Sequence, residues 1–256
     1  MDRDLTAARD LAIDLAVAAG RLQVERRGIV VVGTKAHAND LVSDVDLASE
    51  KLIVDGVTAA WPGDGILAEE GSDAAGTSGW RWVIDPLDGT RNYLTGAGPW
   101  SVCIALQEGV TTRVAVVHDP AAGETYSAVS GSGATLGGAA LGVTTTTRLD
   151  EAIVGLSFNP SPPTKQRMAE LMTTVLPGIG DLRRVPAALD LAYVAAGRFD
   201  AALMVDTRLW DVAAGLLIAT EAGAVVDEVP GAGPELLLAT TPALRPGLLG
   251  LVSAAG

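Results

Sequence analysis

The chain has 256 residues, enough for one large domain or two modest ones, and its 48% hydrophobic content supplies a sizeable core. A formal net charge of −13 argues against a nucleic acid or an anionic membrane surface as partner. No apolar run approaches the ~18 residues of a membrane-spanning helix, and the N-terminal stretch MDRDLTAARDLAID does not resemble a signal peptide. The single cysteine, Cys103, excludes an intrachain disulfide. We therefore expect a cytoplasmic protein without a membrane partner.

Helices and short strands alternate over the first 80 residues. Apolar residues at helical spacing predict an amphipathic helix over 3–26, which ends before Gly28. We then expect a strand at 29–32, a helix over roughly 46–60 and a short strand at 65–68.

Residues 80–137 are rich in β-branched and aromatic residues between Gly, Pro and Asp turn signals, which is typical of an antiparallel sheet. Residues 138–150 contain few core residues, so we place a boundary there. It separates an N-terminal α+β region, 1–145, from a C-terminal α/β region, 146–256.

The C-terminal region alternates strands with helices, which suggests a layered α/β arrangement. The predicted strands are 153–158, 180–185, 201–205 and 235–239. The predicted helices are 164–175, 187–196, 211–222 and 243–253.

Carboxylates follow predicted strands or begin a helix at three places, where ligand sites gather in layered α/β folds. These are Glu69-Glu70, the pair Asp85 and Asp88, and Asp211. Each alone has an ordinary interpretation: a solvated turn, an Asp-initiated turn and a helix N-cap, respectively.

Taken together, the carboxylates favour a cation site. A proline-restricted link separates Asp85 from Asp88, so both can face one small volume. The following stretch, 89–93, can open a helical turn whose backbone N–H groups attract phosphate. Oxygen-only ligands favour Mg²⁺ or Mn²⁺ over zinc. The two histidines, His37 and His118, lie in no ligand-like motif, and we expect surface or turn positions for both.

An aspartyl-phosphate mechanism conflicts with the spacing. Phosphatases of that type use D-x-D-G-T, whose nucleophilic Asp stands two positions before the second Asp. Here that position is Pro86, so the nucleophile cannot be an aspartate at this place.

The motifs resemble those of the inositol monophosphatase family of Mg²⁺-dependent, often lithium-sensitive phosphomonoesterases. The pattern W-[IV]-[IV]-D-P-[IL]-D-G-T-x-N-[FY] after an acidic pair is met by 82–93. W-D-x-A-A-G followed by E-A-G is met by 210–215 and 221–223, and D-L-V-[ST]-x-x-D by 40–46. The resemblance covers nearly the whole chain. It implies an αβαβα sandwich, an α/β layered fold, in a protein that commonly forms homodimers.

The resemblance also implies a role for each matching residue. One Mg²⁺ would be held by Glu69, Asp85 and the Leu87 carbonyl. A second would be held by Asp85, Asp88 and Asp211. Thr90, oriented by Asp46, would position the attacking water beside Glu69. Lys35 and Glu70 would act behind these ligands or at a further, weaker ion. The substrate-binding residues would be Asp88, Gly89, Thr90, Ala187, Ala188 and Asp211.

Two departures from the family pattern concern substrate choice. Many members have Gly-Ser or Gly-Thr followed by Ala where this chain has Pro186-Ala187-Ala188, and several have a carboxylate where it has Met204. Nearby, Asp206 and Arg208 either contact the substrate or form an exposed ion pair.

We therefore expect a small phosphorylated metabolite as substrate: inositol 1-phosphate or a related cyclitol or sugar phosphate. Histidinol phosphate, 3′-phosphoadenosine 5′-phosphate and fructose 1,6-bisphosphate are the alternatives within the family. The alternative of another class is a non-catalytic relative that binds a phosphorylated ligand. Such a relative would have lost a metal ligand or Thr90, and this chain has lost none of them.

Overall fold

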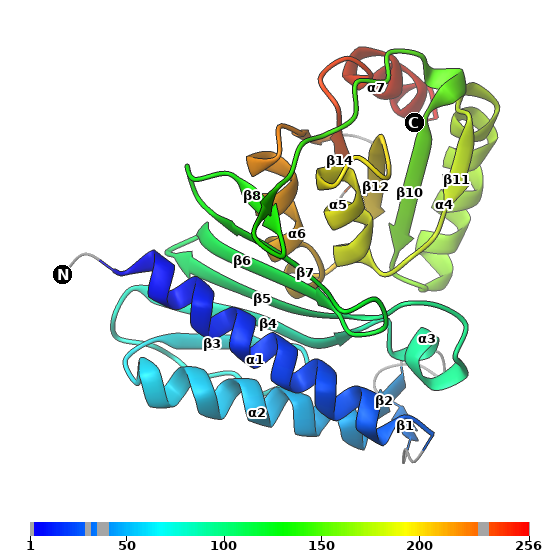
Figure 1. The fold of residues 1–256 in the computed structure, drawn as a ribbon. Coiled ribbons are helices and arrows are strands. Elements are labelled where there is room, and N and C mark those ends of the chain that lie inside the picture. Colours follow the sequence, from blue (N-terminus) through cyan, green and yellow to red (C-terminus); the bar gives the residue numbers. More distant parts are fainter. Residues whose placement is uncertain (1–2, 29–31, 35–40, 230–235, 256) are drawn as a thin grey trace.

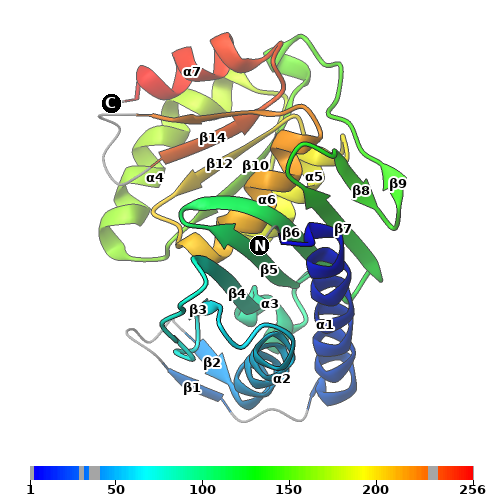
Figure 2. The same ribbon diagram turned by 90° about the vertical axis from the view of Figure 1, so that its left-hand side faces the viewer.

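The computed structural model describes residues 3–28, 32–34, 41–229 and 236–255, which fold into five layers of helix, sheet, helix, sheet and helix (Figure 1). The outer helices of the first layer are α1 (Leu5–Arg26) and α2 (Asp44–Ala60). The central helices are α5 (Ala187–Ala195) and α6 (Leu209–Glu221), and the last layer holds α4 (Pro162–Val175) and α7 (Arg245–Ser253). Figure 2 shows the central helices between the two sheets. The expected αβαβα order is confirmed.

The first large sheet has seven strands in the order β3-β4-β5-β6-β7-β8-β9. The strands are β3 (Gly65–Ala68), β4 (Trp80–Asp88), β5 (Ser101–Glu108), β6 (Thr111–Asp119), β7 (Glu124–Val129), β8 (Ala134–Leu136) and β9 (Ala139–Ala140). Only β3 and β4 pair in parallel, so the expected antiparallel sheet is confirmed for β4 onwards. A separate hairpin joins β1 (Val32–Thr34) to β2 (Leu41–Ser43).

The second large sheet has five strands in the order β11-β10-β12-β14-β13. The strands are β10 (Ile153–Phe158), β11 (Asp181–Arg183), β12 (Ala201–Val205), β13 (Val225–Glu228) and β14 (Leu236–Thr240). The first three run parallel, whereas β14 runs antiparallel to β12 and β13. The remaining helical segments are α3 (Thr90–Thr95) and the 3₁₀ turns η1 (Leu149–Glu151) and η2 (Leu176–Gly178).

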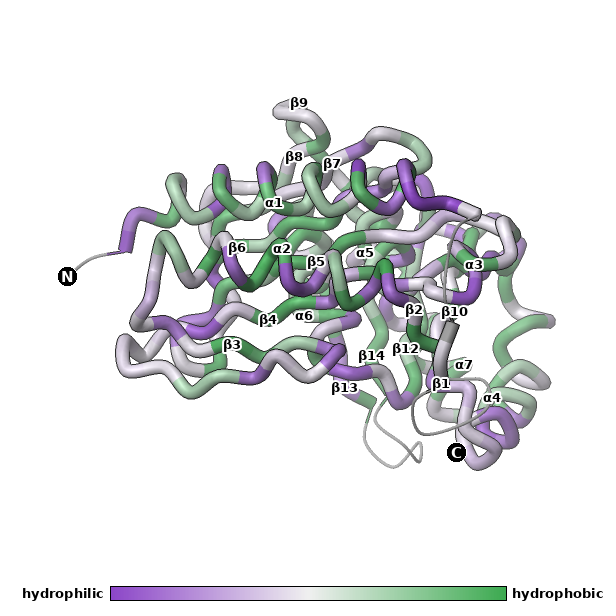
Figure 3. The backbone as a smooth tube through the Cα atoms, turned by 90° about the horizontal axis from the view of Figure 1, so that it is seen from below, coloured by the Kyte–Doolittle hydropathy of each residue, from purple (hydrophilic) through white to green (hydrophobic). Residues whose placement is uncertain are grey.

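Each large sheet is apolar on both faces because helices cover both faces. In β4, Trp82 and Ile84 belong to the core beneath α1 and α2, while Val83 between them packs towards α5 and α6. Hydrophobic residues run along these strands in Figure 3. Helix α1 meets the sheet through four fully buried alanines, Ala8, Ala12, Ala16 and Ala19. Such small side chains allow the helix to lie close to the strands.

The structure differs from the sequence-based expectations at a few places. Strand β13 was not predicted, and its four residues are too few to give a clear periodic signal. The strand expected at 29–32 and His37 fall mostly or wholly outside the described residues. The division at residue 145 stays a prediction, and the strands of the two large sheets lie on either side of it.

The surface or turn position predicted for His118 is wrong, because its side chain is buried within β6. Its Nδ1 lies 2.9 Å from the Thr125 hydroxyl, and its ring packs against Gly20 of α1. Cys103 lies in the core, and burial raises the pKa of its thiol. No helix among the described residues is long and apolar enough to cross a membrane.

Candidate active site

The site begins where β4 leaves its ladder with β5. The pairing of the two strands shifts register between Asp85 and Asp88, so the two residues between them are released from the regular ladder. Asp85 is buried, and its Oδ1 accepts a hydrogen bond from Leu87 N at 2.9 Å. Gly89 follows with φ +94°, a conformation that favours glycine, and α3 begins at the next residue. The expected Asp-initiated turn is therefore present at Asp85–Asp88, and it places both carboxylates at one end of β4.

Glu69 lies at the same edge of the sheet because β3 runs parallel to β4. Ala68 pairs with Ile84, and Glu69 N donates to the Ile84 carbonyl at 3.1 Å. Glu69 acts on the Asp85 carboxyl group through its charge and through a side-chain hydrogen bond, and both raise the pKa of Asp85. Two acids that are 16 positions apart in the chain are therefore neighbours.

Asp211 reaches the site from the start of α6. The helix begins at Leu209 with Arg208 as its N-cap, so Asp211 is the third helical residue, and its interpretation as a simple N-cap is excluded. Its Oδ2 accepts from the Arg208 backbone N–H at 2.8 Å. This bond to the helix N-terminus does not isolate the side chain, since the charge of Asp211 also acts on Asp85 and Asp88.

Burial and neighbouring carboxylates raise the pKa values of Asp85 and Asp88. Burial raises the pKa of Asp85 well above its usual range, and the negative charges of Glu69, Asp88 and Asp211 raise it further. Burial and then Asp211 raise the pKa of Asp88 to about 8. The Ala188 N–H, 2.9 Å from Asp88 Oδ2, offsets part of that rise. A cluster of this kind requires protons or a cation to neutralise it.

The donor set fits a hard divalent cation such as Mg²⁺ or Mn²⁺, because every side-chain donor is a carboxylate oxygen. In the described part of the chain, no group of three or more His, Cys, Asp or Glu side chains is arranged to hold a metal ion as it stands. A divalent cation would require these carboxyl groups in the ionised form.

Thr90 and Asp46 meet at the other side of the Asp85–Asp88 turn. The Thr90 hydroxyl lies 3.0 Å from Asp46 Oδ1 and 3.2 Å from the Leu87 carbonyl. One hydroxyl proton serves only one acceptor at a time, so the group can change partner. Asp46 is fixed by a capping box at the start of α2, where its Oδ2 accepts from the Ser43 N–H and hydroxyl. Burial raises the pKa of Asp46, and these hydrogen bonds lower it.

The segment after β11 closes the site on the side of the C-terminal region. A Cβ on Gly89 would lie 2.7 Å from Pro186 Cγ, so the two residues are in close contact. Ala187 and Ala188 are buried, and the backbone of Ala188 serves Asp88. Ala188 thus contacts Asp88 through its backbone and not through its side chain.

Met204 and Asp206, which distinguish this chain from the family pattern, have different surroundings. Met204 is fully buried among apolar residues of β12, α5 and α6. Asp206 adopts φ +56°, and its carboxylate accepts from the Thr164 hydroxyl at 2.8 Å. An ion pair of Asp206 with Arg208, one of the two alternatives for these residues, does not occur among the ion pairs of the described residues. Thr164, at the start of α4, is the partner instead.

Glu50 was missed by the sequence analysis. It is buried in α2, and its carboxylate accepts from Glu70 N at 2.7 Å and from Ser72 N at 3.0 Å. It thereby fixes the backbone that follows Glu69. Its spacing of one helical turn from Asp46 places both acids on the same face of α2, a signal that could have revealed it. Lys35, the other residue expected behind the ligands, lies outside the described residues.

Glu221, the acid of the E-A-G motif, is structural in this arrangement. Its two carboxylate oxygens accept from the backbone N–H groups of Gly131 and Gly133, at 2.7 and 2.8 Å. The end of α6 is therefore tied to the β7–β8 turn. This contact anchors the helix whose first turn carries Asp211.

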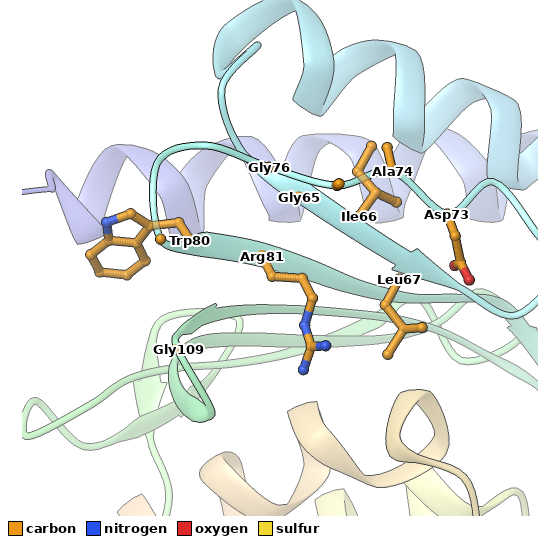
Figure 4. Close-up of a pocket in the computed structure, with 11 residues that line it drawn as sticks. Gly65, Ile66, Leu67, Asp73, Ala74, Gly76, Trp80, Arg81 and Gly109 are labelled. Carbon is orange, nitrogen blue, oxygen red and sulfur yellow. The ribbon is translucent and has the colours of Figure 1, made fainter.

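A shallow pocket of about 450 Å³ lies elsewhere, at the outer edge of the seven-stranded sheet (Figure 4). Arg81 and Leu67 point to the same side of β3 and β4 there. The lining contains none of the four clustered carboxylates. The candidate active site therefore lies outside this pocket.

Comparison with known proteins agrees with the fold. Residues 3–249 match the model of the inositol monophosphatase family, and the chain belongs to that family of metal-dependent phosphatases. Members of the family bind phosphorylated substrates.

Three relatives illustrate the likeness. Inositol-1-monophosphatase SuhB of Mycobacterium tuberculosis is 40% identical over 233 residues, covering 81% of this chain and 80% of the relative. Nus factor SuhB of Escherichia coli is 39% identical over 210 residues, covering 78% and 76%. The crystal structure of the extragenic suppressor protein SuhB of Bartonella henselae has a TM-score of 0.90 at 32% identity, covering 96% of this chain and 98% of that one.

Proposed function

We propose that this protein is a Mg²⁺-dependent phosphomonoesterase that hydrolyses a small phosphorylated metabolite, with inositol 1-phosphate or a related cyclitol or sugar phosphate as the leading substrate. The observation that carries the proposal is the convergence of Glu69, Asp85, Asp88 and Asp211, whose charges act on one another inside a buried site. The name inositol-1-monophosphatase, which relatives at 40% identity carry, supports the substrate.

The four carboxylates and the Leu87 carbonyl would hold two to three ions. When bound, Mg²⁺ supplies positive charge that activates water and stabilises the charge developing on the phosphoryl oxygens. Glu69, Asp88 and Asp211 all act electrostatically on Asp85, so its carboxylate would belong to both of the ligand sets that the resemblance implies. The substrate phosphate would lie near Asp88, Asp211 and the backbone of Gly89 and Thr90.

Thr90, Asp46 and Glu69 would handle the attacking water and its proton. Asp46 accepts the Thr90 hydroxyl proton, which leaves the lone pairs of that oxygen available to orient a water molecule. The neighbouring carboxylate of Glu69 can take up the water's proton. No aspartate attacks the phosphorus in this scheme, in keeping with the spacing around Pro86.

Other substrates and properties remain predictions. The alternative substrates are histidinol phosphate, 3′-phosphoadenosine 5′-phosphate and fructose 1,6-bisphosphate. They stay alternatives because this chain departs from the family pattern at Pro186 and Met204. The homodimer and the cytoplasmic location rest on the family resemblance and the composition. The expected lack of a nucleic-acid partner is weakened, because relatives at 39–40% identity are named Nus factors.

A phosphate-release screen tests the proposal. Metal-stripped protein is mixed with a panel of phosphomonoesters, with and without added Mg²⁺. Release that requires Mg²⁺ and is fastest with a cyclitol or sugar phosphate is expected. Failure to release phosphate from any monoester, while Mg²⁺ binding is demonstrated, would support the non-catalytic relative instead.

A further inference from the structure

Gln23, near the end of α1, is fully buried behind the turn that carries Asp85. Its Nε2 donates to the Pro86 carbonyl at 2.7 Å and to the Ser49 hydroxyl at 3.1 Å, while its Oε1 accepts from Trp100 Nε1 at 2.9 Å. An indole N–H only donates and a carbonyl only accepts, so these partners determine the orientation of the amide. Both N–H groups of the side chain are thus satisfied in the core.

The bond to Pro86 acts on Asp85 through a single peptide group. The Pro86 carbonyl and the Leu87 N–H belong to the same planar peptide, and the described peptide bonds are all trans. In a trans peptide the C=O and N–H point in opposite directions. Gln23 holds the oxygen end, and the N–H end donates to Asp85 Oδ1 at 2.9 Å. The Gln23 side chain of α1 therefore determines the orientation of the Pro86–Leu87 peptide and, through it, that of the Asp85 carboxylate.

We infer that Gln23 is a positioning residue, which orients the Asp85 carboxylate for the divalent cation through the Pro86–Leu87 peptide. The inference rests on the function proposed above. Consecutive hydrogen bonds in a buried chain polarise one another, so the Gln23 donor also strengthens the donor that faces Asp85. Groups behind metal ligands that orient them in this way typically change metal affinity by roughly 10–100-fold when removed.

A purely structural role for Gln23 makes a different prediction. Its side chain also ties α1 to Ser49 of α2 and to Trp100, and these ties alone would affect stability without affecting the cation. Trp100→Phe separates the two roles. It removes the indole N–H from Gln23 and leaves the bond to Pro86 in place. The Tyr93 hydroxyl bonds the Gln23 backbone oxygen at 2.8 Å, so a side-chain substitution does not remove that contact.

The test measures cation binding without substrate. Metal-stripped wild type, Gln23→Met and Trp100→Phe are titrated with Mg²⁺ while the thermal unfolding midpoint is recorded, which yields a Kd for Mg²⁺ through the linkage of binding to stability. We expect a Kd about 10-fold or more higher for Gln23→Met. Trp100→Phe is expected to have a lower midpoint without Mg²⁺ but the Kd of the wild type. Should Gln23→Met fail to fold, Gln23→Asn serves in its place, because it keeps the amide but withdraws it from Pro86 by one methylene.

Two outcomes overturn the inference. One is a Gln23→Met or Gln23→Asn protein that binds Mg²⁺ as the wild type does. The other is an equal loss of affinity in the Gln23 and Trp100 variants, which would mean that the cluster acts only through stability. If Mg²⁺ does not move the midpoint of the wild type, the proposed function itself is contradicted, and the two failures are thereby told apart.

Discussion

Ala188 donates its backbone N–H to the Asp88 carboxylate at 2.9 Å, although the two residues are 100 positions apart in the chain. The bond joins the end of β4 in the seven-stranded sheet to the first turn of α5. Asp88 also lies within electrostatic reach of Asp211 on α6. The candidate site is therefore assembled from both regions of the chain. Each region contributes acids whose negative charges act on the acids of the other region.

Asp88→Asn is expected to abolish turnover while the fold is retained. The amide oxygen can still accept from Ala188, but the negative charge required for a cation is lost, and a fall in kcat on the order of 10²–10³ is the minimum expected for losing an electrostatic group of this kind. Removal of a buried like charge should also raise the unfolding midpoint of the metal-stripped protein at pH 8. Steady-state kinetics and thermal unfolding measure the two effects. Retained activity would contradict the assignment of Asp88 as a metal ligand.

Thr90→Ala is expected to lower kcat by roughly 10²–10⁴-fold and to raise KM far less. The reason is that Thr90 acts on the attacking water and not on substrate affinity. Thr90→Ser, which keeps the hydroxyl next to Asp46, is the matched control and should retain most of the activity. Kinetics of both variants with the same phosphomonoester make the comparison. A change confined to KM would reassign Thr90 to substrate binding.

The stability of the metal-stripped protein should fall as the pH rises from about 4 to about 8. In the unfolded chain Asp88 ionises near its ordinary pKa of 3.8, whereas in the folded protein it keeps its proton until about pH 8. Between these values the folded state binds more protons, so the free energy of unfolding decreases with rising pH. Mg²⁺ should therefore raise the unfolding midpoint more at pH 8 than at pH 5. Asp88→Asn, which cannot ionise, should show a weaker pH dependence, and an identical dependence in both proteins would contradict this account.

Met204→Glu tests whether this position can take the carboxylate that several relatives carry. Met204 is fully buried among apolar side chains, so an unpaired carboxylate there should destabilise the protein by about 3 kcal/mol or more. Met204→Leu conserves the apolar character and should change stability by less than about 1.5 kcal/mol. Chemical denaturation of the two variants gives the difference. A stable Met204→Glu protein with improved use of inositol 1-phosphate would show that the position faces the substrate after all.

The alternation of predicted strands and helices indicated a layered α/β arrangement, and the family resemblance supplied the αβαβα order and the set of acids expected at the site. The Asp85–Asp88 turn follows from its proline and glycine, and the parallel β3–β4 pair brings Glu69 beside it. Gln23 and Glu50 escaped prediction because their partners lie 63 and 20 positions away, on other elements. His118 was misplaced for a similar reason: its hydroxyl partner and the space beside Gly20 exist only in the folded chain.

The most direct test of the central claim is the initial rate of phosphate release from inositol 1-phosphate by metal-stripped protein as Mg²⁺ is added. The account predicts no measurable release without Mg²⁺ and a saturable rise in rate with it, which Asp88→Asn abolishes. Release that proceeds equally with and without Mg²⁺, or that survives in Asp88→Asn, would contradict the claim that the four carboxylates form the catalytic metal site.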